Sequence, residues 1–176
     1  MAVLPASLTL LDAAKAGDNG AFEILLKPVL EPGYRLAGGM LQDHQAAQDA
    51  VQEAAFKAWR KLRQLRDGSD MRPWFLGIVA NECRSVRRSR WSSVVKLFAP
   101  ERSDTPTTDS VVSGIQLRSA LRALDEKKRL ALVLRWYLDL PVEEIATITG
   151  ASAHAVEGQI QRGMHELRQR MEEQRG

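Results

Sequence analysis

Apolar residues along this chain recur at steps of three and four positions, which is the period of an α-helix. No run of alternating β-branched residues is long enough to suggest a strand. The pattern therefore predicts an all-α fold. The expected helices cover residues 8–27, 33–41, 43–65, 73–91, 115–124 and 126–138, and a helix-turn-helix follows over 138–167.

Prolines and acidic residues set several of the expected helix ends. Pro28 and the pair Pro32-Gly33 are predicted to interrupt the first helix, because proline lacks the N–H group that an interior helical turn needs. Asp43 and Asp125 each precede a helical pattern and can cap it through the side-chain carboxylate.

Residues 92–115 differ in character from the rest of the chain. They are rich in serine and threonine and contain two prolines, a composition that is typical of a connector. We therefore expect two small helical domains, residues 1–91 and 116–176, joined by a flexible linker over 92–115.

The closing stretch has the pattern of a helix-turn-helix. Pro141 suits the first turn of one helix, Gly150 can take a positive φ in the turn, and Ser152 can cap the next helix. That second helix carries apolar residues at helical spacing, namely Val156, Ile160, Met164 and Leu167. The arrangement suits a protein that places a helix in the major groove of DNA.

The local charge does not follow that pattern. No Lys or Arg lies between Arg135 and Arg162, whereas Glu143, Glu144 and Glu157 are acidic. Cations normally neutralise phosphates at a DNA interface. The motif therefore indicates DNA binding, and its charge indicates weak attraction to the DNA backbone.

Composition narrows the class of protein. The chain has 176 residues, of which 44% are hydrophobic and 27% charged, as in a soluble globular protein. The net charge of +3 is uneven, because residues 1–100 carry about +4 and residues 101–176 about −1. Cys83 is the one cysteine, and the N-terminus lacks the cationic start of a secretory signal. We expect a cytoplasmic protein.

Signatures of an enzyme are missing. His44, His154 and His165 have no Cys or carboxylate partners at metal-ligand spacing, and no phosphate-binding glycine loop, dinucleotide fingerprint or serine elbow occurs. We expect Cys83 to be a small core residue. We therefore expect no enzymatic activity, no metal and no cofactor.

The helix predicted over 73–91 carries the most chemistry. Asn81, Arg84, Arg88 and Trp91 recur at steps of three and four, Arg87 and Arg90 broaden the cationic face, and Trp74 and Phe75 lie near the other end. Arginines can follow a phosphate backbone, and aromatic rings can stack on unpaired bases. The alternative is a solvated basic helix whose two aromatic residues lie in the core.

The helix predicted over 43–65 offers a second polar surface. With its alanines facing inward, Asp49, Gln52, Glu53 and Lys57 point outward along one stripe. A stripe of this kind is usually a solvated face, and the pattern alone does not raise it above that.

Together these segments resemble a known family. The run DHQAAQDAVQEAAFKAW (43–59) is similar to the core helix of region 2 of bacterial sigma factors, and RPWFLGIVANECRSVRR (72–88) to the promoter-melting helix that follows it. The stretch LRALDEKKRLALVLRWY (121–137) with the helix-turn-helix resembles region 4. Two regions joined by a short linker are typical of the extracytoplasmic-function (ECF) sigma factors of the sigma-70 family.

The resemblance implies a promoter-specificity subunit with RNA polymerase core (beta and beta-prime subunits), promoter DNA and an anti-sigma factor as partners. It assigns polymerase binding to Asp49, Gln52 and Glu53. It assigns the minus-ten element, including a flipped base, to Arg66, Asp67, Ser69, Met71, Trp74, Asn81, Arg84, Arg87 and Arg88. It assigns the minus-thirty-five element to Ser152, His154, Glu157, Gln161 and Arg162.

The chain departs from the family at the recognition helix. Members commonly have Thr-Val-Lys-Ser-Arg near its start, whereas this chain has Ala-Val-Glu-Gly-Gln over 155–159. Glutamate can accept from a cytosine amino group but repels phosphate. Two alternatives follow: a sigma mimic that titrates an anti-sigma factor, and a two-domain helix-turn-helix regulator. The chain shows no apolar heptad seam for the dimer that the second needs, and a mimic has no need of Arg84, Arg87, Arg88 and Trp74.

Overall fold

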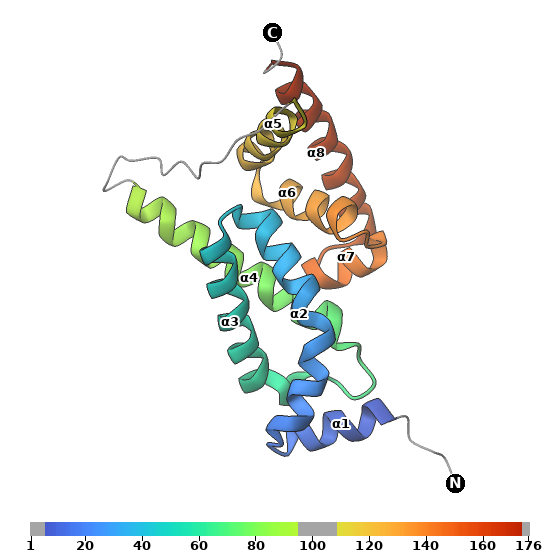
Figure 1. Ribbon diagram of the computed structural model, residues 1–176. Helices are drawn as coiled ribbons and strands as arrows, with labels where there is room; N and C mark the ends of the chain where they lie inside the picture. The colour runs from blue at the N-terminus through green and yellow to red at the C-terminus, as the bar shows by residue number, and fades with distance from the viewer. Residues whose placement is uncertain (1–5, 95–108, 174–176) are drawn as a thin grey trace.

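The computed structural model describes residues 6–94 and 109–173, with side chains over 10–89 and 114–173. Within these residues the protein is all-α, which confirms the predicted fold class (Figure 1). The helices are α1 (Ala6–Lys15), α2 (Asn19–Leu41), α3 (His44–Lys61), α4 (Met71–Val94), α5 (Asp109–Ala123), α6 (Glu126–Leu132), α7 (Val142–Thr149) and α8 (Ala153–Glu173), with a 3-10 turn η1 (Leu62–Gln64) and a π-helical turn η2 (Val133–Tyr137).

The N-terminal helices differ from the sequence prediction. The expected helix over 8–27 is divided at Gly17, whose φ of +104° is a conformation that glycine adopts without strain. Asp18 then caps α2 by accepting a hydrogen bond from the Ala21 N–H at 3.0 Å. The predicted interruptions at Pro28 and Pro32 are wrong, because α2 runs through both prolines to Leu41.

Burial explains why α2 continues through its prolines. An interior proline destabilises a helix by about 3 kcal/mol because it removes a hydrogen bond and crowds the preceding turn. Pro28 is exposed and Pro32 only partly buried, so water can reach the carbonyl groups that lose their partners. Helix α2 also buries Val29, Leu36 and Met40 in the core, and the burial of these large side chains offsets the cost.

Helices α2, α3 and α4 form an N-terminal bundle. Asp43 caps α3 as predicted, accepting from the Ala46 N–H at 2.9 Å. The residues predicted for the inner face of α3 are all buried, namely Ala47, Ala50, Val51, Ala54, Ala58 and Leu62. Phe75 of α4 is fully buried and lies against Gly33 of α2, where an added Cβ would come within 2.9 Å of its ring.

Helices α6, α7 and α8 form a C-terminal unit that contains the predicted helix-turn-helix. Asp125 caps α6 through the N–H groups of Lys127 and Lys128. Gly150 takes a φ of +67° in the turn before α8. The hydroxyl of Ser152 accepts from the Ala155 N–H at 3.1 Å, as a helix cap should. The motif is therefore built from the residues that the sequence indicated.

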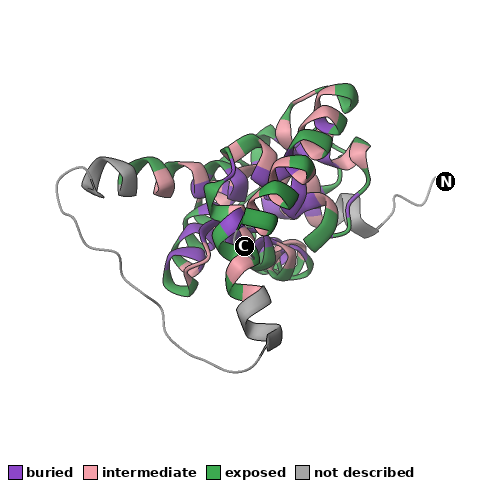
Figure 2. Cartoon of the chain, turned by 90° about the horizontal axis from the view of Figure 1, so that it is seen from above, coloured by how far each residue is buried: buried purple, intermediate pink, exposed green. Residues whose placement is uncertain are grey.

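The two units pack against each other. Helix α7 contacts α4 and η2 contacts α2, and buried apolar residues of both units form one continuous core (Figures 1 and 2). Helix α4 extends to Val94 and α5 begins at Asp109. The rest of the segment predicted as a linker, 95–108, lies outside the described residues.

Candidate nucleic-acid and polymerase interfaces

One side of α4 carries the candidate DNA-binding residues. Trp74, Asn81, Arg84 and Arg88 follow each other at helical spacing, so they share a side of the helix. Trp74 is partly buried at the edge of the core, whereas Asn81 and Arg88 are exposed. We call these four residues, with Gly77 between them, the α4 stripe. The side chain of Trp91 lies outside the described residues.

The two aromatic residues near the start of α4 have different environments. Phe75 is buried in the core, as the alternative interpretation of this helix predicted. Trp74 keeps part of its surface accessible, so it can also present a ring face to a base.

Two α4 arginines form ion pairs with the C-terminal unit. Nε of Arg72 lies 3.3 Å from Oε1 of Glu144, and Nε of Arg84 lies 2.8 Å from Oε1 of Glu126. Arg84 also donates to Oδ1 of Asn81 at 3.4 Å. These ion pairs could not be predicted from helical periodicity, because their members lie far apart along the chain.

Arg87 is half-buried beside another cation. Arg129 is 2% exposed and donates to the carbonyl groups of Leu121, Arg122, Leu124 and Met40. Burial first, and the charge of Arg87 second, lower the pKa of Arg129 to about 10. Carbonyl groups at the ends of α5 and α2 thus stabilise a buried cation where the two units meet.

The loop before α4 lies next to this helix and is exposed from Arg66 to Asp70. Gly68 has a φ of +78°, and the Asp70 carboxylate accepts from the Arg72 N–H at 2.9 Å. Asp67 pairs with Lys15 of α1. Arg66, Asp67 and Ser69 are accessible, whereas Met71 is 8% exposed and supports the loop from within the core.

The polar stripe on α3 is exposed as expected. Asp49, Gln52 and Glu53 face solvent, and Glu53 lies 3.5 Å from Lys57. Nζ of Lys57 also donates to Glu82 at 2.8 Å, and this bond is the main reason why the pKa of Lys57 is raised.

Phe56 extends this stripe, and the sequence pattern had not singled it out. Its side chain is 55% exposed, and the Arg60 guanidinium lies 5.7 Å from the centre of the ring. Helical spacing could have identified it, because Phe56 follows Asp49 and Gln52 at steps of three and four on the polar side of α3.

The recognition helix α8 presents its predicted residues openly. Ser152, His154, Glu157, Gln161 and Arg162 are all exposed.

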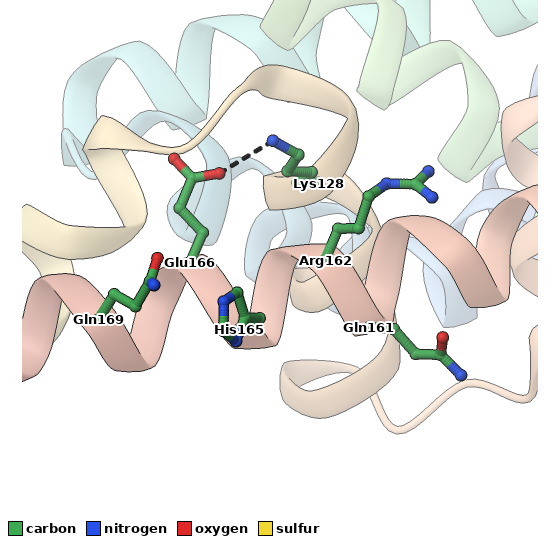
Figure 3. A pocket seen from close by; sticks show the side chains of 6 residues that line it. All are labelled: Lys128, Gln161, Arg162, His165, Glu166 and Gln169. Atoms are coloured by element: carbon green, nitrogen blue, oxygen red, sulfur yellow. Dashed lines mark hydrogen bonds and ion pairs between the residues drawn. The ribbon is translucent and has the colours of Figure 1, made fainter.

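A shallow hollow of about 490 Å³ lies beside this helix. Its lining residues, shown in Figure 3, are Lys128, Gln161, Arg162, His165, Glu166 and Gln169. Lys128 donates to Glu166 at 2.9 Å, and this bond and a second from Arg170 lower the pKa of Glu166. Lys128 adds a cation near α8 that the motif alone did not indicate.

No described helix is long and apolar enough to cross a membrane. No group of His, Cys, Asp and Glu within the described part could hold a metal ion. Cys83 is fully buried, and this burial raises the pKa of its thiol to about 12, so it lies in the core as predicted.

Known proteins resemble both the sequence and the fold. RNA polymerase sigma factor SigV of Bacillus subtilis is 26% identical over 137 residues, which cover 77% of this chain and 81% of that protein. RNA polymerase sigma-H factor of Pseudomonas aeruginosa is 27% identical over 169 residues, 86% of each chain.

Two solved structures resemble the fold of this chain. The sigma factor RpoE in complex with the anti-sigma factor NepR from Bartonella quintana has a TM-score of 0.70 and 25% identity, over 86% of this chain and 96% of that one. CnrH in complex with the cytosolic domain of CnrY, at 24% identity, has the same fold with a TM-score of 0.71 over 93% and 95% of the two chains.

Family models cover the same two units. The model described as Sigma-70 region 2 matches residues 26–93, and the model described as Sigma-70, region 4 matches residues 114–167. Together they span most of the chain, in the order that the sequence predicts. The chain therefore belongs to the sigma-70 family and is an RNA polymerase sigma factor of the extracytoplasmic-function type.

Proposed function

We propose that this sigma factor binds core RNA polymerase through α3 and opens the minus-ten element with α4. The α3 surface combines Asp49, Gln52 and Glu53 with the exposed ring of Phe56. An aromatic side chain beside hydrogen-bonding groups is a frequent anchor of protein interfaces. The partner is the clamp of the beta-prime subunit, and the beta subunit completes the core contact.

The α4 stripe carries the proposed melting activity, and it is the observation on which the proposal rests most. Its cations are suited to phosphates and Trp74 to a displaced base. The exposed loop Arg66 to Asp70 lies at the start of the same helix, where it can receive a flipped base. Flipping costs a few kcal/mol, so stacking and pocket contacts have a clear energetic role.

Helix α8 is the proposed reader of the minus-thirty-five element. His154, Glu157 and Gln161 are exposed on one side of its first turns, where a recognition helix contacts base edges. Glu157 can accept from a cytosine amino group. Arg162 is the first cation along α8, so the attraction of the first turns of this helix for phosphate is small.

An anti-sigma factor is the proposed regulatory partner, and the cytoplasm, where polymerase acts, the proposed compartment. One relative of known structure, the sigma factor RpoE, was solved in complex with an anti-sigma factor, which supports this proposal. The protein itself is proposed to have no catalytic activity, since its role is to position polymerase on DNA.

Run-off transcription with purified core polymerase tests the proposal. Core polymerase alone and core polymerase with this protein are compared on fragments of the source genome. Discrete new transcripts would establish promoter-directed initiation, and their start sites would reveal both promoter elements. Core binding without transcripts would favour a sigma mimic, and absence of core binding would refute the proposed function.

A further inference from the structure

Helix α1 lies beside η1 and the loop over 66–70 that precedes α4 (Figure 1). The Lys15 ammonium lies 2.5 Å from Oδ1 of Asp67 in this loop. The carbonyl oxygen of the same lysine accepts a hydrogen bond from Nε of Arg63 in η1 at 3.3 Å. One residue of α1 therefore binds the segment 63–67 at two points, once by its side chain and once by its backbone.

The position of Lys15 at the end of α1 allows both contacts. Gly17, with a φ of +104°, follows directly after the helix. The last carbonyl groups of a helix have no partner within it, and Arg63 supplies one for the Lys15 carbonyl. The side chain of Lys15 is 20% exposed, whereas that of Asp67 is 72% exposed. Because its neighbours already restrict the lysine, less conformational entropy is lost when its ammonium holds the loop.

Asp67 belongs to a tight turn within the loop. The Ser69 N–H donates to the Arg66 carbonyl at 3.1 Å, which closes a four-residue turn. Asp67 takes the second position of this turn, and Gly68 takes the third, where a positive φ is typical of a type II turn. The ion pair with Lys15 therefore fixes the middle of the turn, while Arg66 and Ser69 remain exposed on either side of it.

We propose that Lys15 and Arg63 are positioning residues that hold the loop in the shape that reads a flipped base, and that Asp67 is part of this support and does not read the base. This inference rests on the proposed role of the loop in the minus-ten element. A loop that already has its binding shape loses less entropy when the base enters. Arg66 and Ser69 then read the base, and the base preference depends on a residue of α1 that does not touch DNA.

Variants of the ion pair test this support in the full chain with core polymerase. Lys15→Met keeps an unbranched side chain and removes the charge, and Asp67→Asn removes the opposite charge. Their double variant and the swap Lys15→Glu with Asp67→Lys complete the set. Asp12→Asn on α1 and Lys27→Met on α2 remove exposed charges elsewhere and are the matched controls. On a promoter fragment that the wild-type holoenzyme transcribes, each minus-ten base is replaced in turn. The specificity ratio is the transcript yield with the preferred base divided by the yield with another base.

Each single variant should lower the specificity ratio at one minus-ten position by about two- to fivefold, the range expected from one exposed ion pair. The double variant should lose no more than either single variant, because both remove the same contact. The swap should recover most of the ratio, and the controls should keep it. A variant that only destabilises the fold would lower transcription from every fragment alike and leave the ratio unchanged.

Two results would overturn the proposal and leave the proposed function intact. One is a wild-type ratio in both single variants. The other is a loss in Asp67→Asn alone, without recovery in the swap, because Asp67 would then contact the base directly.

The backbone contact is tested separately. Arg63→Ala removes the donor to the Lys15 carbonyl and keeps the Lys15–Asp67 pair. It should lower the specificity ratio at the same minus-ten position as Lys15→Met, because both variants loosen the attachment of α1 to one loop. A wild-type ratio, or a loss at a different position, would overturn the positioning role of Arg63.

Amide hydrogen exchange of the free protein, measured by NMR, separates this inference from the proposed function. If the wild-type holoenzyme gives no transcript, the proposed function fails and the support of the loop is decided by this second measurement. The Ser69 N–H closes the turn, so it should exchange about two- to fivefold faster in Lys15→Met and in Asp67→Asn than in the wild type. Lys27→Met should keep the wild-type rate. Equal rates in all variants would overturn the proposed support.

Discussion

The two helices proposed for promoter binding differ in charge and in access. Helix α4 carries Arg84, Arg87 and Arg88 within little more than one turn, and α7 packs onto the middle of its stripe. Helix α8 is open to solvent over its first turns but has no cation before Arg162. The helix with more cations is covered only at the middle of its stripe, and the more accessible helix has no cation over its first turns.

This difference indicates a division of labour between the two units. Non-specific affinity for DNA comes mainly from phosphate contacts, whereas specificity comes from base edges. In the proposed function, helix α8 supplies sequence reading and helix α4 supplies affinity for the DNA backbone.

The largest expected effect comes from removing charge from α4. Arg84→Ala with Arg88→Ala should weaken promoter-complex formation by about 10- to 100-fold, since hydrogen bonds to charged groups contribute roughly 1.5–3 kcal/mol. The slope of log K against log salt should flatten by about 0.7 for each phosphate contact to a single strand. Titration of holoenzyme on a promoter fragment at several salt concentrations measures both quantities.

Lys27→Ala removes an exposed cation of α2 and serves as the control for this pair. The control should leave the slope unchanged. A double variant with the wild-type slope would remove both arginines from the phosphate contacts and would end the contrast between α4 and α8.

Polymerase binding by α3 should give the next largest effect. Asp49→Ala and Gln52→Ala should each lower affinity for core polymerase, and Phe56→Ala should lower it by about tenfold, as expected for an aromatic anchor worth about 1–2 kcal/mol. Fluorescence anisotropy of labelled protein titrated with core enzyme measures this affinity. Glu23→Ala on α2 is the control, and circular dichroism checks that helicity is kept. If all three variants bind normally, the α3 stripe is a solvated face.

A smaller effect, and a gain, is expected on α8. Glu157→Gln should strengthen binding to duplex DNA carrying the minus-thirty-five element by about two- to fivefold, because it removes repulsion worth about 0.5–1 kcal/mol. Glu172→Gln near the far end of the same helix is the matched control. A loss of binding at one base pair only would instead show that Glu157 reads a cytosine.

Local chemistry made much of the fold predictable. The alanine face of α3 and the caps Asp43, Asp125 and Ser152 follow from helical period and from side chains that accept backbone N–H groups. The exposed α3 and α4 residues were found in the same way. Each of these features depends on neighbours within a few positions of the chain.

Features that depend on distant contacts were not predictable. The prolines of α2 were expected to end a helix, because the sequence shows their cost but not the burial of Val29 and Leu36 that offsets it. The pairs Arg72–Glu144 and Arg84–Glu126 join residues of different units. Periodicity cannot indicate such a contact, since it reports which face of a helix is buried and not against what.

The two adjacent glycines of α2 give the smallest expected effect and the sharpest contrast. Gly38→Ala should stabilise the protein by about 0.5–1 kcal/mol, because alanine favours a helix and open space surrounds this position. Gly39→Ala has the same helical gain, but its methyl group meets Val133 and Tyr137, and overpacking costs about 1–3 kcal/mol. Urea denaturation should therefore show opposite signs, and small-angle scattering should show expansion for Gly39→Ala alone. Equal stabilities and equal radii would mean that η2 does not contact α2 in solution, and α4 would then be as accessible as α8.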